Sequence, residues 1–179
     1  MMGGELESLL DQGYQARREQ RLAEALQRFA EAVDLSRKSD DRALLAQSLT
    51  GKGQIERDLG DLEGALKCYE EAVDLYRVLN RPLVLAHTIR HVGDILRNQT
   101  QLGMAAPHYE EALAIYRGLD DAPPLDLANA IRGYALLRSS VGEKAEAAKL
   151  WQEAGALYAA VGVQAGVAES EVQVARLTA

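Results

Sequence analysis

The stretch LEGALKCYEEAVDLY, residues 62–76, decides the fold, because its spacing returns three more times along the chain. It carries an alanine at 65, a tyrosine four residues later and a second alanine three residues after that. The same spacing occurs at Ala25/Phe29/Ala32, Ala105/Tyr109/Ala112 and Ala147/Trp151/Ala154. The first alanines thus stand at positions 25, 65, 105 and 147, which gives two equal steps and a slightly longer third one. A fixed period of about 20 to 50 residues is typical of stacked units, so the sequence predicts four similar repeats.

A second series of small residues precedes the first and marks a partner helix in each repeat. Gly13, Gly53 and Gly93 lie at one constant distance before the first alanine of their repeat, and Ala135 takes this place in the fourth. A small residue lets two helices approach closely, and the aromatic residue fills the space between neighbouring repeats. Neither helix can bury its apolar face alone, so we expect stacked helix pairs.

The segment GQIERDLGDLEGALKCYEEAVDLY (53–76) resembles the tetratricopeptide repeat, whose pattern combines small residues, alanines and one aromatic residue at these spacings. The resemblance covers residues 5 to 160, although the tryptophan and the proline usual in this family are missing. The repeat also exceeds the usual length of about 34 residues. Helices about one turn longer would account for this, as in kinesin light chain and a group of bacterial repeat proteins.

The repeats and the resemblance together predict an all-α fold. It is an α-solenoid, a right-handed superhelix of about four helix pairs followed by a C-terminal capping helix. We expect a single domain over residues 1–179. The expected repeats cover residues 4–37, 42–79, 83–118 and 125–160, and the expected capping helix covers residues 164–177. Pro107 falls inside a second helix, which should therefore start late, near residues 104–106, or bend there.

Composition excludes several classes of protein. The net charge of −7 argues against nucleic-acid binding, which requires Lys and Arg to neutralise phosphates. No run approaches the roughly 18 apolar residues of a membrane-spanning helix, so no membrane partner is expected. The single cysteine, Cys68, cannot form an intramolecular disulfide, and the start MMGGELESLL lacks the pattern of a signal peptide. The expected localisation is cytoplasmic.

The resemblance also implies a ligand groove, because the first helices of tetratricopeptide arrays line a concave surface. Five arginines recur at the corresponding positions, and Arg suits bidentate binding of carboxylates, so an acidic or C-terminal peptide segment is the natural ligand. In the alternative interpretation these arginines pair with Asp58, Asp94 and Asp126. The candidate groove residues are Tyr14, Arg17, Gln54, Arg57, His87, Arg90, Asp94, Arg97, Asn129 and Arg132.

Two specialised sites are not expected. The carboxylate clamp of some tetratricopeptide domains is absent, because Leu10, Tyr14, Gly51, His87 and His91 occupy its positions. His87, His91 and Asp94 share one helical face and could form a metal site, but short spacings of this kind occur often by chance, so groove residues are the favoured interpretation. No metal and no cofactor is expected.

Catalysis has no candidate residues, because Cys68 has no nearby histidine and no nucleophile motif occurs. The leading hypothesis is a non-catalytic scaffold that binds a protein or peptide in the groove. The second is a structural protein that self-assembles, for example as a homodimer, through a last helix bearing Val167, Val172, Val174 and Leu177. The third is a peptide-sensing module of a larger regulator.

Overall fold

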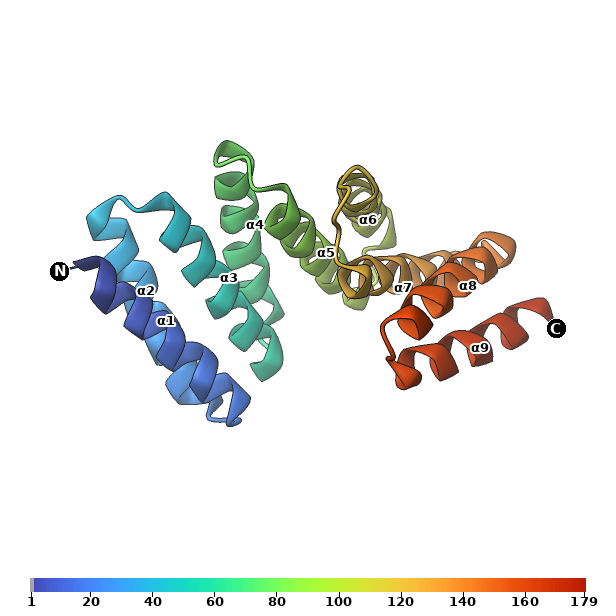
Figure 1. Cartoon of the computed structure of the whole chain (residues 1–179), viewed down its shortest axis with the longest axis horizontal. Coiled ribbons are helices and arrows are strands. Elements are labelled where there is room, and N and C mark those ends of the chain that lie inside the picture. Colours follow the sequence, from blue (N-terminus) through green and yellow to red (C-terminus); the bar gives the residue numbers. More distant parts are fainter. Residues whose placement is uncertain (1) are drawn as a thin grey trace. The chain divides into compact units, whose positions relative to one another are not determined.

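The computed structural model describes residues 2–179, and Met1, where the expected domain begins, lies outside them. Within this range the chain forms nine helices and no strand (Figure 1), which confirms the predicted all-α repeat fold. The helices are α1 (Met2–Arg18), α2 (Leu22–Ser39), α3 (Arg42–Leu59), α4 (Leu62–Val78), α5 (Pro82–Asn98), α6 (Leu102–Arg117), α7 (Pro124–Ser140), α8 (Lys144–Ala160) and α9 (Gln164–Thr178).

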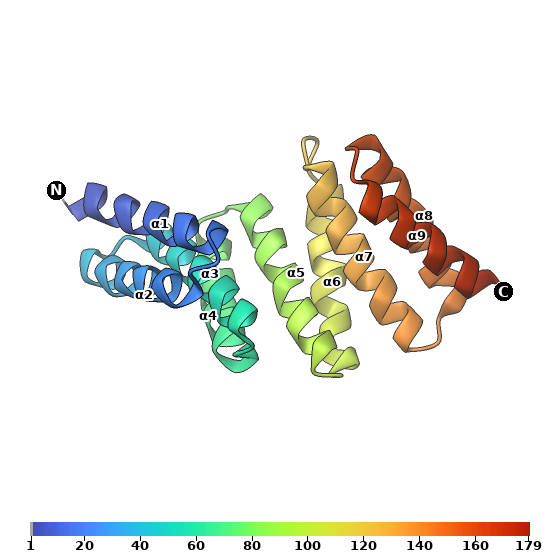
Figure 2. The same ribbon diagram turned by 90° about the horizontal axis from the view of Figure 1, so that it is seen from below.

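Consecutive helices pack against one another within two compact units. The N-terminal unit extends to Thr88, and the C-terminal unit covers Ile89–Ala179. In the first, α2 contacts both α1 and α3, and α3 contacts α4 (Figure 1). In the second, α8 contacts both α7 and α9, so these three helices lie side by side (Figure 2). Helix α5 passes through the boundary without interruption.

Most helix connections use the same turn. After Gly60, which has a φ of +89°, the N–H of Asp61 donates to the carbonyl of Glu56 (2.8 Å) and thereby closes the end of α3. The connection between α6 and α7 is longer, as the wider last step of the repeat predicts, and its described residues have no positive φ. Residues with positive φ occur elsewhere, at a constant spacing on each side of that connection, and they are Gln20, Asp40, Gly60, Asn80, Thr100, Gly142 and Gly162.

The aromatic anchors pack against glycines of two different helices. Phe29 on α2 is fully buried, and a methyl group added at Gly13 or Gly51 would lie 2.9 or 2.3 Å from its ring carbons. A methyl group added at Gly133 would likewise lie 2.5 Å from a ring carbon of Tyr109 on α6. Because such distances are shorter than any real contact between carbon atoms, only glycine fits at Gly51 and Gly133 without movement of the ring.

Pro107 does not delay the start of its helix. Helix α6 already begins at Leu102, so the expectation of a late start was wrong. The carbonyl of Gln101 accepts hydrogen bonds from the N–H groups of Met104 (3.0 Å) and Ala105 (2.9 Å), which close the first turn before the proline is reached. Pro107, which lacks a backbone N–H donor, lies inside this helix.

None of the described helices combines the length and the apolar character that crossing a membrane requires.

Candidate functional site

Five of the ten candidate groove residues lie in the N-terminal unit. Tyr14 and Arg17 are on α1, Gln54 and Arg57 are on α3, and His87 is on α5. The first helices of three successive repeats therefore supply them. The other five, Arg90, Asp94, Arg97, Asn129 and Arg132, belong to the C-terminal unit and are described separately below.

A pocket of about 550 Å³ brings three of these side chains together. Tyr14, Gln54 and His87 all line it. Its apolar wall includes Leu44 and Val84. The volume lies within the range of typical ligand sites, which combine apolar surface with a few directed polar groups.

The polar wall of the pocket consists mainly of uncharged hydrogen-bonding groups. Tyr14 shares a hydrogen bond with Gln47, and Thr50 Oγ1 lies 3.3 Å from the hydroxyl of Tyr76. Burial raises the pKa of Tyr14 and of Tyr76 above the usual value, although these hydrogen bonds act in the opposite direction. Both phenols therefore remain protonated at neutral pH and can donate hydrogen bonds to a ligand.

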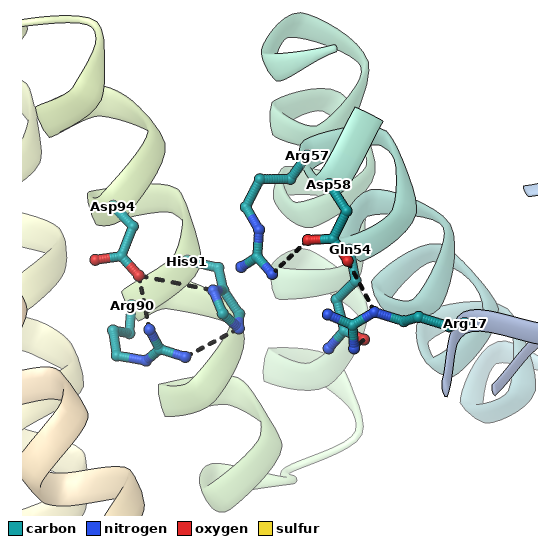
Figure 3. A network of polar contacts seen from close by, with 7 residues as sticks. All are labelled: Arg17, Gln54, Arg57, Asp58, Arg90, His91 and Asp94. Atoms are coloured by element: carbon teal, nitrogen blue, oxygen red, sulfur yellow. Dashed lines mark hydrogen bonds and ion pairs between the residues drawn. The ribbon is translucent and has the colours of Figure 1, made fainter. Parts of the chain in front are cut away.

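Asp58 lies between the two candidate arginines of this unit (Figure 3). Its Oδ2 accepts a hydrogen bond from Arg17 Nε at 2.9 Å, and its Oδ1 accepts one from Arg57 Nη2 at 3.1 Å. Arg17 Nη1 also donates to Gln54 Oε1 at 3.0 Å. Arg17, Asp58 and Tyr14 line a second hollow of about 350 Å³. Asp58 thus pairs with both Arg17 and Arg57, as in the interpretation that these arginines pair with neighbouring carboxylates.

The charge state of Asp58 follows from these contacts. Partial burial alone would raise its pKa, but the hydrogen bonds and charges of Arg17 and Arg57 outweigh burial and lower the pKa below the usual value. The carboxylate is ionised at neutral pH, so the two guanidinium groups already hold an anion.

In the C-terminal unit, Arg90 and Asp94 form part of a compact polar network (Figure 3). Arg90 Nη1 donates to Asp94 Oδ2 at 2.6 Å, and Arg90 Nη2 lies 3.0 Å from His91 Nε2. Because arginine can only donate, the His91 nitrogen accepts this bond and is unprotonated. The hydroxyl of Tyr109 donates to Asp94 Oδ1 at 2.7 Å. Asp94 therefore joins the candidate surface to the buried aromatic anchor of α6.

The remaining candidates also have partners within the C-terminal unit. Arg132 forms a bidentate pair with Glu169, at 2.6 and 2.8 Å, a partner that the alternative interpretation did not name. Asn129 Oδ1 accepts a hydrogen bond from the hydroxyl of Tyr158 at 2.8 Å. Arg97 Nε donates to the Tyr109 hydroxyl at 3.3 Å. Each of these contacts connects two helices of the unit.

Sequence reasoning singled out neither the apolar residues that line the pocket nor its polar residues Tyr76, Arg81 and Thr88. Tyr76 lies near the end of a second helix, and Arg81 lies in the connection before Pro82, so neither belongs to the periodic positions of the first helices. An available signal was the Arg-Pro pair, since proline favours the first position of a helix and thus places Arg81 at its start.

The geometry gives no metal centre and no activated thiol among residues 2–179. No group of three or more His, Cys, Asp or Glu side chains in this range could hold a metal ion. Cys68 is buried and donates to Glu56 Oε2 at 3.2 Å. Burial, and then the hydrogen bond to Glu56, raise the pKa of its thiol to about 12, so the nucleophilic thiolate is scarcely populated at neutral pH.

Residues 5–77, which include α1 to α4 almost entirely, match the tetratricopeptide repeat family. This segment of the chain is similar to tetratricopeptide repeats. The match covers the helices α1 and α3 that contribute Tyr14 and Gln54 to the pocket. A comparison with curated protein sequences gives no match.

Solved structures share the tetratricopeptide-like fold over nearly the whole chain. A putative kinesin light chain with nearly identical repeats from Podosopora anserina has 15% sequence identity and a TM-score of 0.71, and the alignment covers 97% of this chain and 95% of that one. Aspartyl phosphate phosphatase F from Bacillus subtilis has 16% identity and a TM-score of 0.84, with coverage of 95% and 44%. At these identities the comparisons establish the fold alone.

A Rap protein in complex with competence and sporulation factor also shares the tetratricopeptide-like fold, with 16% identity and a TM-score of 0.76. The alignment covers 92% of this chain and 46% of the Rap protein. The chain therefore spans less than half the length of this relative and of the Bacillus phosphatase.

Proposed function

We propose that this protein is a non-catalytic binding scaffold that holds a peptide segment in the pocket of the N-terminal unit. The observation that carries the proposal is the pocket itself, in which Tyr14, Gln54 and His87 meet from three successive first helices. A tetratricopeptide-like fold favours protein or peptide partners. One structural relative, the Rap protein, was solved with competence and sporulation factor bound to it.

The chemistry of the pocket suits an extended peptide. An unpaired peptide backbone presents N–H and C=O groups that need hydrogen-bond partners when they leave water. Gln47 and Gln54 can each donate and accept such bonds, and the hydroxyl of Tyr14 can donate one. Leu44 and Val84 offer apolar contacts to the ligand's side chains. We place this binding in the cytoplasm, a proposal supported by the single, buried Cys68 thiol.

Filling the pocket tests the proposal. Ala43 is exposed, lines the pocket and is the second residue of α3, so Ala43→Trp should occupy the pocket without disturbing the core. Peptides selected from a random display library on the wild-type protein should bind Ala43→Trp at least about tenfold more weakly by fluorescence anisotropy, equivalent to about 1.4 kcal/mol.

A matched control exists on the preceding helix. Ala23 is also exposed and is also the second residue of its helix, α2, but it does not line the pocket. Ala23→Trp should therefore retain wild-type affinity. Selected peptides that bind Ala43→Trp as tightly as Ala23→Trp would show that the pocket is not the peptide site.

Self-association is a second candidate function, favoured by an apolar hollow of about 470 Å³ on α8 and α9. Trp151, Val167, Val174 and Ala175 line it. Ala175 corresponds in the repeat to Gly53, which in the second repeat is covered by Tyr69 and Cys68 of α4, at 3.1 and 3.2 Å from a methyl group added there.

We propose that the last helix of a second copy covers this hollow. Glu171 and Arg176 lie on the same helix, so two antiparallel copies of α9 could pair the Glu171 of one copy with the Arg176 of the other.

A further inference from the structure

Arg81 is the cationic residue of the pocket that lacks a carboxylate partner. It lines the pocket and is exposed, and among residues 2–179 it forms neither an ion pair nor a side-chain hydrogen bond. Burial has the largest effect on the pKa of Tyr76 and raises it, whereas the charge of Arg81 acts in the opposite direction. Tyr76 and Arg81 both line the pocket, so the positive charge of Arg81 acts within it.

The backbone fixes the place from which the Arg81 side chain extends. The N–H of Arg81 donates to the carbonyl of Tyr76 at 3.1 Å, and its carbonyl accepts from the N–H of Leu85 at 3.0 Å. Pro82 follows and restricts the backbone further. Arg81 is thus held at the junction of α4 and α5, both of which contribute residues to the pocket.

The two arginines that the sequence favoured as anion-binding residues are in a different situation. Arg17 and Arg57 already share the ionised carboxylate of Asp58. A carboxylate from a ligand would have to displace Asp58, which would lose both hydrogen bonds and leave a partly buried charge without partners. No such competitor faces Arg81.

The other residues that line the pocket carry no negative charge. They include no Asp and no Glu, and their polar groups are hydroxyls, amides and the imidazole of His87. An anionic group of a ligand therefore meets no repulsion from the residues that line the pocket, and Arg81 attracts it.

We propose that Arg81, and not Arg17 or Arg57, selects the charge of the ligand. The pocket binds a peptide segment that carries one carboxylate, held by the Arg81 guanidinium, with uncharged residues beside it. This inference rests on the proposed function of peptide binding. Bidentate hydrogen bonding between a guanidinium group and a carboxylate provides the recognition.

Two peptide libraries test this inference on the full chain. Both consist of acetylated and amidated hexapeptides, so neither has terminal charges. In the first library one position carries Asp and the others draw on Ala, Leu, Ser and Asn. In the second library Asn replaces that Asp. Immobilised protein is incubated with each library, and retained peptide is quantified by mass spectrometry.

The wild-type protein should retain the Asp library about five- to tenfold better than the Asn library at low salt, and less so at high salt, because exposed charges are screened. In Arg81→Ala this ratio should fall to about one, with retention of the Asn library unchanged. The double variant Arg17→Ala/Arg57→Ala should keep the ratio. Arg37→Ala removes an exposed arginine outside the pocket and is the control for net charge.

The outcomes separate the two proposals. If Ala43→Trp abolishes retention but Arg81→Ala keeps the wild-type ratio, the role of Arg81 is wrong and the peptide pocket stands. If the Arg17/Arg57 double variant loses the ratio instead, those arginines bind the ligand and the inference is overturned. If the wild-type protein retains neither library, both proposals fail. Equal melting temperatures of the variants exclude misfolding as the cause.

Discussion

Gly133 shows how a single residue sets the distance between two helices. It lies on α7, and the ring of Tyr109 on α6 occupies the space where a side chain would begin. The Tyr109 hydroxyl also donates to Asp94 at 2.7 Å, so the ring is held at both its edge and its tip. A displacement of the ring would therefore disturb two helices at once.

Gly133→Ala should destabilise the protein. The added methyl group would lie 2.5 Å from the Tyr109 ring, and overpacking of this kind costs about 1–3 kcal/mol. Alanine regains up to about 1 kcal/mol of helix propensity. We expect a net loss of up to about 2 kcal/mol, measured by urea denaturation.

Gly103→Ala is the matched control in the same unit. Gly103 lies in α6 and has no atom within 4 Å of the added methyl group, so this variant should be as stable as the wild type or slightly more stable. Equal stability of Gly133→Ala and Gly103→Ala would contradict the close approach of α6 and α7 at Tyr109.

At the scale of single residues, the spacing of the repeat predicted which aromatic residues are buried. It did not predict which charged residues of different helices pair. The aromatic anchors Phe29 and Tyr109 follow from the repeat, because their burial is imposed at every period. The pairing of Arg132 with Glu169 joins two helices, α7 and α9, that are separated by the whole of α8 in the sequence. The repeat does not specify this contact, because Glu169 lies outside the periodic positions that define the four repeats.

Helix α9 has the position of a first helix, but no second helix among residues 2–179 covers its outer face. In the second repeat the corresponding face of α3 is covered by α4, whose Tyr69 and Cys68 lie against Gly53. On α9 the equivalent position, Ala175, is exposed and lines an apolar hollow together with Val174. Such a surface is suited to association with another helix.

We expect the protein to form a dimer through this surface, and Val174→Glu should dissociate it. Light scattering at increasing concentration should approach twice the monomer mass of 19.5 kDa for the wild type and remain near the monomer mass for the variant. A carboxylate placed in the apolar hollow loses hydration without gaining a partner, which weakens association.

Val141→Glu provides the comparison for this experiment. Val141 is also an exposed valine, 46% accessible, at the end of α7 and outside the hollow. This variant should dimerise as the wild type does. A wild-type protein that remains monomeric at high concentration would rule out self-association as a function of α9.

The elements themselves follow closely from the sequence, because period and turn residues repeat together. The exception is the start of α6, where Pro107 suggested a later beginning. The proline's local preference was overridden by the hydrogen bonds that Gln101 accepts from Met104 and Ala105. The sequence could not show that the first turn closes upstream of the proline.

At the scale of the whole molecule, α5 is the element shared by the two compact units. Residues 82–88 belong to the N-terminal unit and residues 89–98 to the C-terminal unit, yet the helix is continuous. Helix formation is cooperative along a chain, so the loss of α5 would remove structure from both units. We therefore propose that the chain unfolds as the single domain expected from its repeats.

One transition should be seen with two different probes. Trp151 is the chain's one tryptophan, is fully buried and lies in the C-terminal unit, so its fluorescence monitors that unit alone. Far-UV circular dichroism monitors all helices. In urea the two curves should have the same midpoint, which is the test of two-state unfolding.

A variant with the probe moved provides the control. Tyr76→Trp in a Trp151→Phe background places the tryptophan in the N-terminal unit, at a buried aromatic position. Its fluorescence should again coincide with its own circular dichroism curve. In one possible outcome the fluorescence midpoint lies above the circular dichroism midpoint for one of these two proteins and below it for the other. This outcome would show that the units unfold independently.

The turns with positive φ also determine how such a chain can change its length. Because the same backbone reversal recurs at a constant spacing on either side of the longer α6–α7 connection, duplication of one whole repeat would leave every later helix in its original phase. The insertion would bring its own glycine, its own aromatic anchor and its own closing turn. Growth or loss of whole repeats is thus the least disruptive kind of change available to this sequence, whereas a short insertion inside a helix would rotate everything beyond it.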